Sequence, residues 1–167
     1  LPDLPRTALL DILLRRPPRT HSGGALPRTG SPVDDITAAL TDLDSSYLAV
    51  HGPPGTGKTH TAAHAIARLV GDHGWRVGVV AQSHAVVENL LTGIVGAGVD
   101  PQRIAKKDNK TTGASWLEIG TDDYPAFVAD HPGCVIGGTA WDFANPQRVE
   151  PGALDLAVRH AERIGAD

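Results

Sequence analysis

The sequence predicts an α/β fold in which a parallel β-sheet is flanked by helices. Short apolar runs typical of buried strands alternate with longer segments whose apolar residues recur at helical spacing. One of these runs leads directly into a glycine-rich loop and then a helix, which is the order of a βα unit. Parallel strands joined through helices need right-handed crossovers. The 167 residues suit one domain with a substantial core.

The first 31 residues are expected to form a region apart from the rest of the chain. Residues 1–16 carry a short amphipathic pattern of leucines, which predicts an N-terminal helix. Residues 17–31 are rich in Pro, Gly, Arg and Ser and have no periodicity, as expected of a linker. The α/β domain is therefore expected over residues 32–167.

A helix is predicted to begin at Pro32. Ser31 is a suitable N-cap, proline is favoured at the first helical position, and Asp34 follows as in a weak capping box. Apolar residues then recur along one face, which we expect to pack on the sheet: Val33, Ile36, Leu40 and Leu43.

The most specific feature is the stretch from residue 52 to residue 59, which matches the phosphate-binding pattern GxxxxGK[ST]. We expect a strand over residues 47–51 before it and a helix over residues 58–70 after it. Glycines let the backbone amides turn toward phosphate oxygens, and the helix adds its positive end. We expect ATP and Mg²⁺ as cofactors, bound by Gly52, Pro53, Pro54, Gly55, Thr56, Gly57, Lys58, Thr59 and His60.

Two residues of this loop are the catalytic candidates. Lys58 is expected to reach the β- and γ-phosphates, and the Thr59 hydroxyl is expected to ligate Mg²⁺. The alternative is a Gly/Pro-rich turn that matches the pattern by chance. The apolar run and the helical pattern on either side favour a nucleotide site.

The remainder of the chain continues the alternation of strands and helices. A second buried strand is predicted over residues 75–81, and the helix after it carries apolar residues on one face up to residue 96. Residues 99–131 are less regular, with a short helix near residues 124–129. Two further strands are predicted over residues 134–138 and 153–158.

Composition limits the function classes. A net charge of −4 and a pI near 6.0 give no overall attraction to nucleic acid, so such contacts must be local. The single cysteine, Cys134, rules out an intrachain disulfide and suits a cytoplasmic protein. No apolar run approaches the ~20 residues that span a bilayer, so no membrane partner is expected. Methionine is absent, even at position 1, which indicates a fragment or a processed product.

Two further segments resemble the motifs of superfamily 1 helicases. AAA-type ATPases share the loop sequence Gly-Pro-Pro-Gly-Thr-Gly-Lys-Thr, so the loop alone does not distinguish the two families. Residues 77–91, however, resemble helicase motif Ia, and residues 134–140 resemble the element before motif II. The chain is similar to the first RecA-like domain of superfamily 1, in the branch that includes the helicase of nonsense-mediated decay. Three blocks are closer still to bacterial proteins that join a RecB-like nuclease to such a motor: residues 47–54, 79–90 and 137–146.

The resemblance implies an ATP-driven translocase on single-stranded DNA or RNA, with residues 32–167 as a partial RecA-like domain. Gln82, Ser83, His84 and Thr139 match positions that contact the strand. The alternative for Ser83 is a plain N-cap of the following helix, and the alternative for His84 is a solvated turn residue. For Thr139 and Trp141, the alternative to contact with a nucleic-acid strand or base stacking is ordinary packing within the protein. The basic cluster at residues 106–110 is expected to be a solvated loop rather than a nucleic-acid contact.

The sequence departs from the family where motif II should stand. The family has an Asp-Glu pair there, which holds Mg²⁺ and orients water, whereas this chain has Arg159-His160-Ala161-Glu162. A second RecA-like domain and a nuclease domain are also expected to be missing. We therefore expect nucleotide binding without efficient hydrolysis, and whether the chain is an enzyme stays open. The alternatives are a free-standing small P-loop ATPase or kinase, an AAA-type ATPase fragment, or a non-catalytic protein.

Overall fold

The computed structural model describes residues 7–53, 55–107, 113–120 and 122–159. The chain divides into two compact units, Leu1–Ala65 and Ile66–Asp167. The boundary between them falls inside one helix, α3 (Lys58–Asp72).

The first unit contains α1 (Ala8–Leu13), α2 (Pro32–Thr41) and the first turns of α3. Helix α2 begins as predicted: the Ser31 hydroxyl accepts a hydrogen bond from the Asp34 amide at 3.5 Å, and Pro32 follows the cap. The stretch between α1 and α2 makes an isolated antiparallel bridge, from Thr20 to Leu43. The end of α2 and the segment after α1 therefore lie side by side.

The strand predicted over residues 47–51 is absent, and this prediction was wrong. These residues have no regular secondary structure, and Val50 is 53% exposed. An extended apolar run becomes a strand only where a neighbouring strand takes up its N–H and C=O groups. Among the described residues, no strand of the sheet is paired with residues 47–51. The phosphate-loop pattern is therefore preceded by an irregular segment.

The second unit confirms the predicted parallel sheet. Its strands run in the order β3-β2-β4-β1-β5, and every pairing is parallel. Their bounds are β1 (Arg76–Ala81), β2 (Ile104–Lys107), β3 (Leu117–Ile119), β4 (Cys134–Thr139) and β5 (Leu156–Arg159). Strands β1, β4 and β5 were predicted, whereas β2 and β3 were not. These two are only four and three residues long, and a 3₁₀ turn, η1 (Pro101–Arg103), precedes β2.

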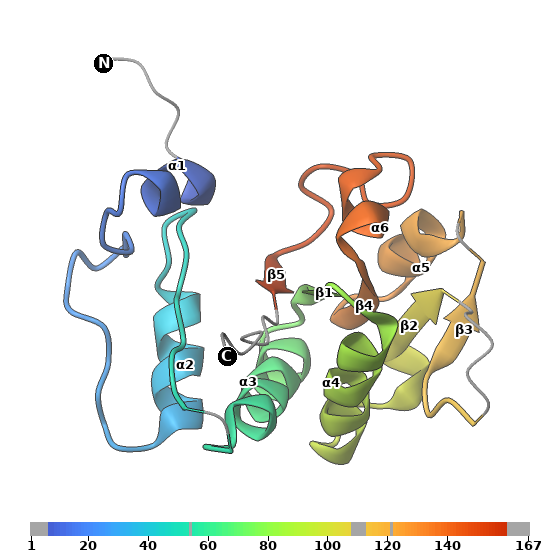
Figure 1. Ribbon diagram of the computed structural model, residues 1–167, viewed down its shortest axis with the longest axis horizontal. Helices are drawn as coiled ribbons and strands as arrows, with labels where there is room; N and C mark the ends of the chain where they lie inside the picture. The colour runs from blue at the N-terminus through green and yellow to red at the C-terminus, as the bar shows by residue number, and fades with distance from the viewer. Residues whose placement is uncertain (1–6, 54, 108–112, 121, 160–167) are drawn as a thin grey trace, which may run out of the picture. The chain divides into compact units, whose positions relative to one another are not determined.

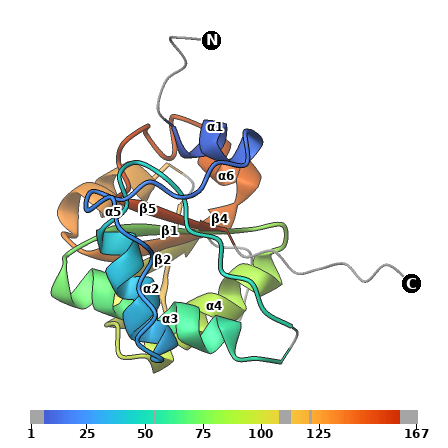
Figure 2. The ribbon, with the colours of Figure 1, turned by 90° about the vertical axis from the view of Figure 1, so that its left-hand side faces the viewer.

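Helices cover both faces of this sheet (Figures 1 and 2). Helix α4 (His84–Gly96) packs on β1 and β4 with the apolar stripe that the sequence predicted, Val87, Leu90, Leu91 and Ile94. Helices α5 (Tyr124–Asp130) and α6 (Ala140–Ala144) pack against β4 on the opposite side. The carboxyl ends of β1 and β4 are thereby held between two packed layers.

Lys106 contradicts the solvated loop predicted for residues 106–110. It lies in β2, its side chain is 1% exposed, and its ammonium group is 3.0 Å from a carboxylate oxygen of Glu88 on α4. Burying a cation is tolerated only where an opposite charge compensates for the loss of water. Lys107 is also in β2, and residues 108–110 lie outside the described residues. The ion pair with Glu88 thus compensates the buried charge of Lys106 within the sheet.

Candidate functional site

The phosphate loop has the backbone that its glycines were expected to provide. Gly55 and Gly57 have φ angles of +78° and +76°, a region that other residues rarely adopt. The Thr56 hydroxyl donates to the Pro53 carbonyl at 2.8 Å and closes the turn. Pro54 lies outside the described residues. Successive residues of such a turn present their amide groups to one side, as phosphate binding requires.

Lys58 directs its ammonium group at this loop. The Nζ atom donates to the carbonyl oxygens of Gly52 at 2.7 Å and of Pro53 at 2.6 Å. A Cβ atom at Gly52 would lie 3.0 Å from the Thr56 hydroxyl, so the loop closes around a position that suits glycine. The cation and the turn that would hold an anion are therefore in direct contact, and the donor set fits a phosphate group.

The loop continues directly into α3, a helix of 15 residues. The Gly57 carbonyl accepts from the Thr61 amide at 2.9 Å, so the helical ladder starts inside the motif. The first amides of a helix lack partners within it and carry its positive end, which favours an anion. Thr59 lies on the first turn. His60 is exposed, and its ring packs on that of His64 with centroids 4.1 Å apart.

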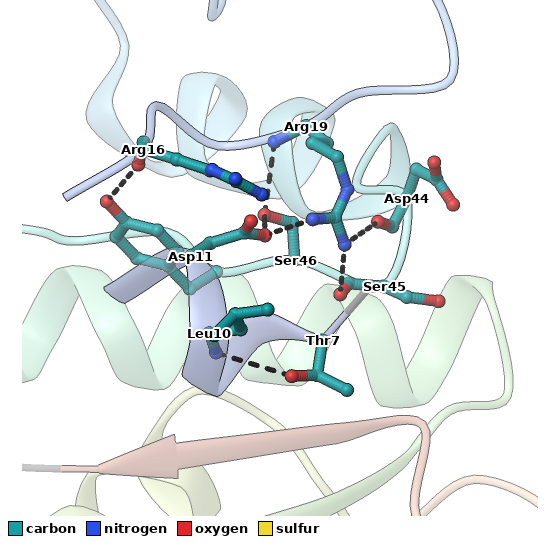
Figure 3. A network of polar contacts seen from close by, with 9 residues as sticks. Thr7, Leu10, Asp11, Arg16, Arg19, Asp44, Ser45 and Ser46 are labelled. Atoms are coloured by element: carbon teal, nitrogen blue, oxygen red, sulfur yellow. Dashed lines mark hydrogen bonds and ion pairs between the residues drawn. The ribbon is translucent and has the colours of Figure 1, made fainter. Parts of the chain in front are cut away.

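A buried polar network supports the segment that leads to the loop (Figure 3). Asp11 of α1 is 1% exposed; it forms an ion pair with Arg19 and accepts a hydrogen bond from the Ser46 hydroxyl at 3.0 Å. The Arg19 guanidinium also donates to the carbonyls of Asp44 and Ser45, at 3.2 and 3.0 Å. These contacts fasten residues 11–19 to residues 44–46.

The same network includes a contact one residue closer to the loop. The Tyr47 hydroxyl donates to the Arg16 carbonyl at 2.7 Å. This support could not be predicted from the sequence, because its partners are up to 35 positions apart and neither Asp11 nor Arg19 belongs to a motif. Residues 17–31 were predicted to be a linker, but Arg19 within them stabilises the segment that leads to the phosphate loop.

The candidate strand-contacting residues lie together at the carboxyl edge of the sheet in the second unit. Strands β1 and β4 are parallel neighbours, with Ala81 opposite Thr139. Gln82 and Ser83 follow β1 and are exposed. The Ser83 hydroxyl accepts from the Val86 amide at 3.4 Å, so Ser83 is the N-cap of α4, as its alternative interpretation predicted.

His84 is not the solvated turn residue of its alternative interpretation. It is the first residue of α4 and is only partly exposed. Its Nδ1 atom is buried and has no hydrogen-bond partner among the described residues. A buried ring nitrogen without a partner loses the hydrogen bond that water would provide.

Thr139 is tied to a buried carboxylate. Its amide and its hydroxyl donate to Asp142 at 2.9 and 2.8 Å, and Arg148 donates to the other oxygen at 2.6 Å. Burial raises the pKa of Asp142, but the hydrogen bonds from Thr139 and the charges of Lys107 and Arg148 outweigh it, so the pKa lies below its ordinary value. The Thr-x-x-Asp spacing, a capping-box pattern, is the sequence signal that we missed.

Trp141 contradicts the packing alternative. The side chain is 84% exposed on α6, two residues beyond the end of β4. Asp155, by contrast, binds the amide of Arg76 at 2.8 Å, where β1 begins. It therefore lies at the amino edge of the sheet, away from Thr139. His160, Ala161 and Glu162 lie outside the described residues.

Neither a metal centre nor a membrane span is found in the part of the chain that the structure describes. No three His, Cys, Asp or Glu side chains gather there as metal ligands. None of the described helices is both long and apolar enough to cross a bilayer. Cys134 is buried in β4, and burial raises the pKa of its thiol to about 11.

Comparison with known proteins gives one family. The AAA domain family matches residues 33–131, more than half of the chain. DNA-binding protein SMUBP-2 of Rattus norvegicus is 32% identical over 100 residues, covering 52% of this chain and 9% of that protein. The Regulator of nonsense transcripts 1 homolog of Drosophila melanogaster is 32% identical over 101 residues, covering 60% of this chain and 8% of that protein. No solved structure matches the chain.

The chain thus spans less than a tenth of the length of these two relatives. The matched residues include the phosphate loop, β1, α4 and β2, and the parallel sheet with flanking helices is that of a partial P-loop domain. The chain therefore belongs to the AAA domain family, in its helicase-like P-loop branch.

Proposed function

We propose that this chain is the ATP-binding part of a superfamily 1 motor that moves along single-stranded DNA or RNA. The observation that carries the proposal is the phosphate loop, in which Gly55 and Gly57 have positive φ and the Lys58 ammonium lies on the loop. The family match, which covers this loop, supports the same conclusion.

Each residue of the loop has a role in the proposal. The amides of residues 55–59 would hold the phosphates, Lys58 would balance the charge of the β- and γ-phosphates, and the Thr59 hydroxyl would ligate Mg²⁺. His60 lies beside the phosphates on the first turn of α3. When bound, the magnesium ion would neutralise phosphate charge.

The track for the nucleic acid is the carboxyl edge of the sheet in the second unit. Gln82, Ser83, His84 and Thr139 would contact the sugar-phosphate backbone, and the parallel register of β1 and β4 supports this grouping. One relative is named as a DNA-binding protein and the other as a regulator of transcripts. Both DNA and RNA are therefore candidate tracks.

The complete motor would include parts beyond those described. A second RecA-like domain would close the ATP site, and the likeness of three sequence blocks to nuclease-helicase fusions suggests an associated nuclease and a cytoplasmic role in DNA repair. With Arg159-His160-Ala161-Glu162 in place of an acidic pair, this chain would bind ATP and turn it over slowly at best.

Calorimetry with ATP and Mg²⁺ tests the nucleotide site. Lys58→Ala removes the point charge on the phosphates and should weaken binding by about 1–3 kcal/mol, the worth of a charge-assisted hydrogen bond. The control is Arg28→Ala, which removes an exposed cation outside the loop and should leave the affinity unchanged. Equal affinity of Lys58→Ala and wild type would overturn the proposal.

Binding of labelled single strands separates a motor from a small-molecule kinase. Fluorescence anisotropy should detect binding of a dT or rU oligonucleotide to the wild-type chain, falling with added salt because phosphate contacts release counterions. A kinase for a small metabolite has no reason to bind either oligonucleotide. Absence of binding to both would remove the nucleic-acid part of the proposal and leave the ATP part standing.

A further inference from the structure

We propose that Trp141 is a stacking platform for an unpaired base of single-stranded nucleic acid. The inference rests on the proposed function and adds to it a contact with a base, whereas Gln82, Ser83, His84 and Thr139 would hold the backbone. It is carried by the exposure of the side chain, by the way its helix is anchored, and by its place at the same edge of the sheet as those residues.

Trp141 differs from the other two tryptophans of the chain. It is 84% exposed, whereas Trp116 is 9% exposed in the core and Trp75 is half-buried. Large aromatic side chains contribute to stability mainly by being buried, and an indole that faces water forgoes that contribution. Aromatic faces presented to solvent are the surfaces on which single-stranded nucleic acids stack their bases.

The backbone that carries Trp141 is anchored on both sides. Before it, the amide and hydroxyl of Thr139 are bound to Asp142, and Arg148 holds the same carboxylate. After it, Phe143 packs so closely on the sheet that a Cβ atom at Gly138 would lie 3.0 Å from its ring. The indole is therefore presented from a fixed backbone, which lowers the entropy lost when a ligand binds.

Trp141 also follows the end of β4, which is the neighbour of the strand that leads to the exposed polar residues Gln82 and Ser83. Ala81 pairs with Thr139, so the exposed Gln82 and Ser83 leave β1 at the edge where Trp141 follows β4. Ligands of open parallel sheets bind outside the carboxyl ends of the strands. Sugar-phosphate contacts at the end of β1 and a base on Trp141 would occupy one continuous edge.

The local charge favours a polyanion at this edge although the whole chain is acidic. Lys107 and Arg148 are both close enough to Asp142 to lower its pKa. Around Asp142, two cations therefore face one carboxylate, whereas the net charge of the whole chain is −4. Arg148 is 25% exposed although it pairs with Asp142, so its guanidinium is still accessible from solvent. An approaching phosphate would meet a locally positive surface.

Anisotropy titrations with two labelled strands of equal length test the inference. One strand is oligo-dT, and the other is an abasic strand with the same sugar-phosphate backbone. Trp141→Ala should weaken oligo-dT binding about 5- to 150-fold, the equivalent of 1–3 kcal/mol for one stacked base, and should leave abasic binding unchanged. Trp141→Phe should retain most of the affinity because it keeps an aromatic face.

The control is Leu13→Ala, which removes another exposed apolar side chain, 69% exposed, from the first unit and should change neither affinity. Binding of oligo-dT should also quench wild-type tryptophan fluorescence, and Trp141→Phe should abolish that quenching. Equal oligo-dT affinity of wild type and Trp141→Ala would overturn the inference alone. An equal loss of affinity for both strands would mean that Trp141 contacts the sugar-phosphate backbone. A loss of self-association in Trp141→Ala would mean that Trp141 contacts a second copy of the chain. Either result would also overturn the inference.

Discussion

Asp142 is a nearly enclosed charge whose ionised form the fold favours. The side chain is 4% exposed, and its oxygens receive hydrogen bonds from Thr139 and Arg148. These partners cost the chain little conformational freedom, because all three lie within ten residues. They also connect the end of β4 to the segment after α6. A single carboxylate therefore helps to fix the backbone on either side of Trp141.

The lowered pKa of Asp142 predicts a loss of stability in acid. The ordinary carboxyl pKa is 3.8 and the folded-state pKa lies below it, so the ionised form stabilises the fold fully above pH 3.8. The contribution is lost as the pH falls through the folded-state pKa, where the native carboxylate takes up its proton. Urea denaturation of wild type and Asp142→Asn should therefore differ by about 1–3 kcal/mol at pH 7, and the difference should shrink as the pH falls below 3.8 and through the folded-state pKa. A difference that stays constant with pH would contradict this.

At the scale of elements, the sheet and its helices approach closely where glycine replaces a side chain. A Cβ atom at Gly78 of β1 would lie 2.8 Å from Leu154 and closer still to the Phe143 ring. On the other face, a Cβ atom at Gly137 of β4 would lie 2.7 Å from Val87 of α4. Strands β1 and β4 thus allow close packing on the two faces of the sheet, because each has a glycine where the packed side chains approach.

Gly78→Ala should destabilise the second unit by about 1–3 kcal/mol, because the added methyl group forces Phe143 and Leu154 to move. The matched control is Gly71→Ala on α3, where a Cβ atom would meet nothing within 4 Å. That change should be neutral or stabilising by about 0.5–1 kcal/mol, since alanine is the better helix former. Thermal and urea denaturation measure both. Equal effects of the two substitutions would show that Phe143 does not pack on β1.

At the scale of the whole molecule, protection should follow the sheet order. Strands β1 and β4 have a neighbour on each side, whereas β5 is at the edge of the described sheet and residues 47–51 belong to no strand. In hydrogen exchange, the amides of β1 and β4 should be the slowest, those of β5 intermediate, and those of residues 47–51 fast. Protection of residues 47–51 as strong as that of β1 would mean that this segment pairs as a strand in solution.

The segments that the sequence predicted correctly depend on neighbours within a few residues. Ser31 caps α2 through an amide three positions away, the stripe of α4 repeats at helical spacing, and Gly55 and Gly57 adopt positive φ inside their own turn. Strands β1 and β4 could be predicted because parallel strands buried on both faces are nearly continuous apolar runs. The phosphate loop and the carboxyl edge of the sheet were therefore expected from the sequence.

Tertiary structure decided the features that depend on residues far apart in the chain. The apolar run at residues 47–51 has no ladder partner and stays irregular, whereas Lys106 enters a strand because Glu88 on another element compensates its charge. Arg19 is partly buried and binds residues 25 to 27 positions away. Trp141 is exposed on α6, where Asp142 is buried and the partly buried Phe143 packs on the sheet. Local propensity cannot specify these outcomes, because each follows from which partner the fold brings to a side chain.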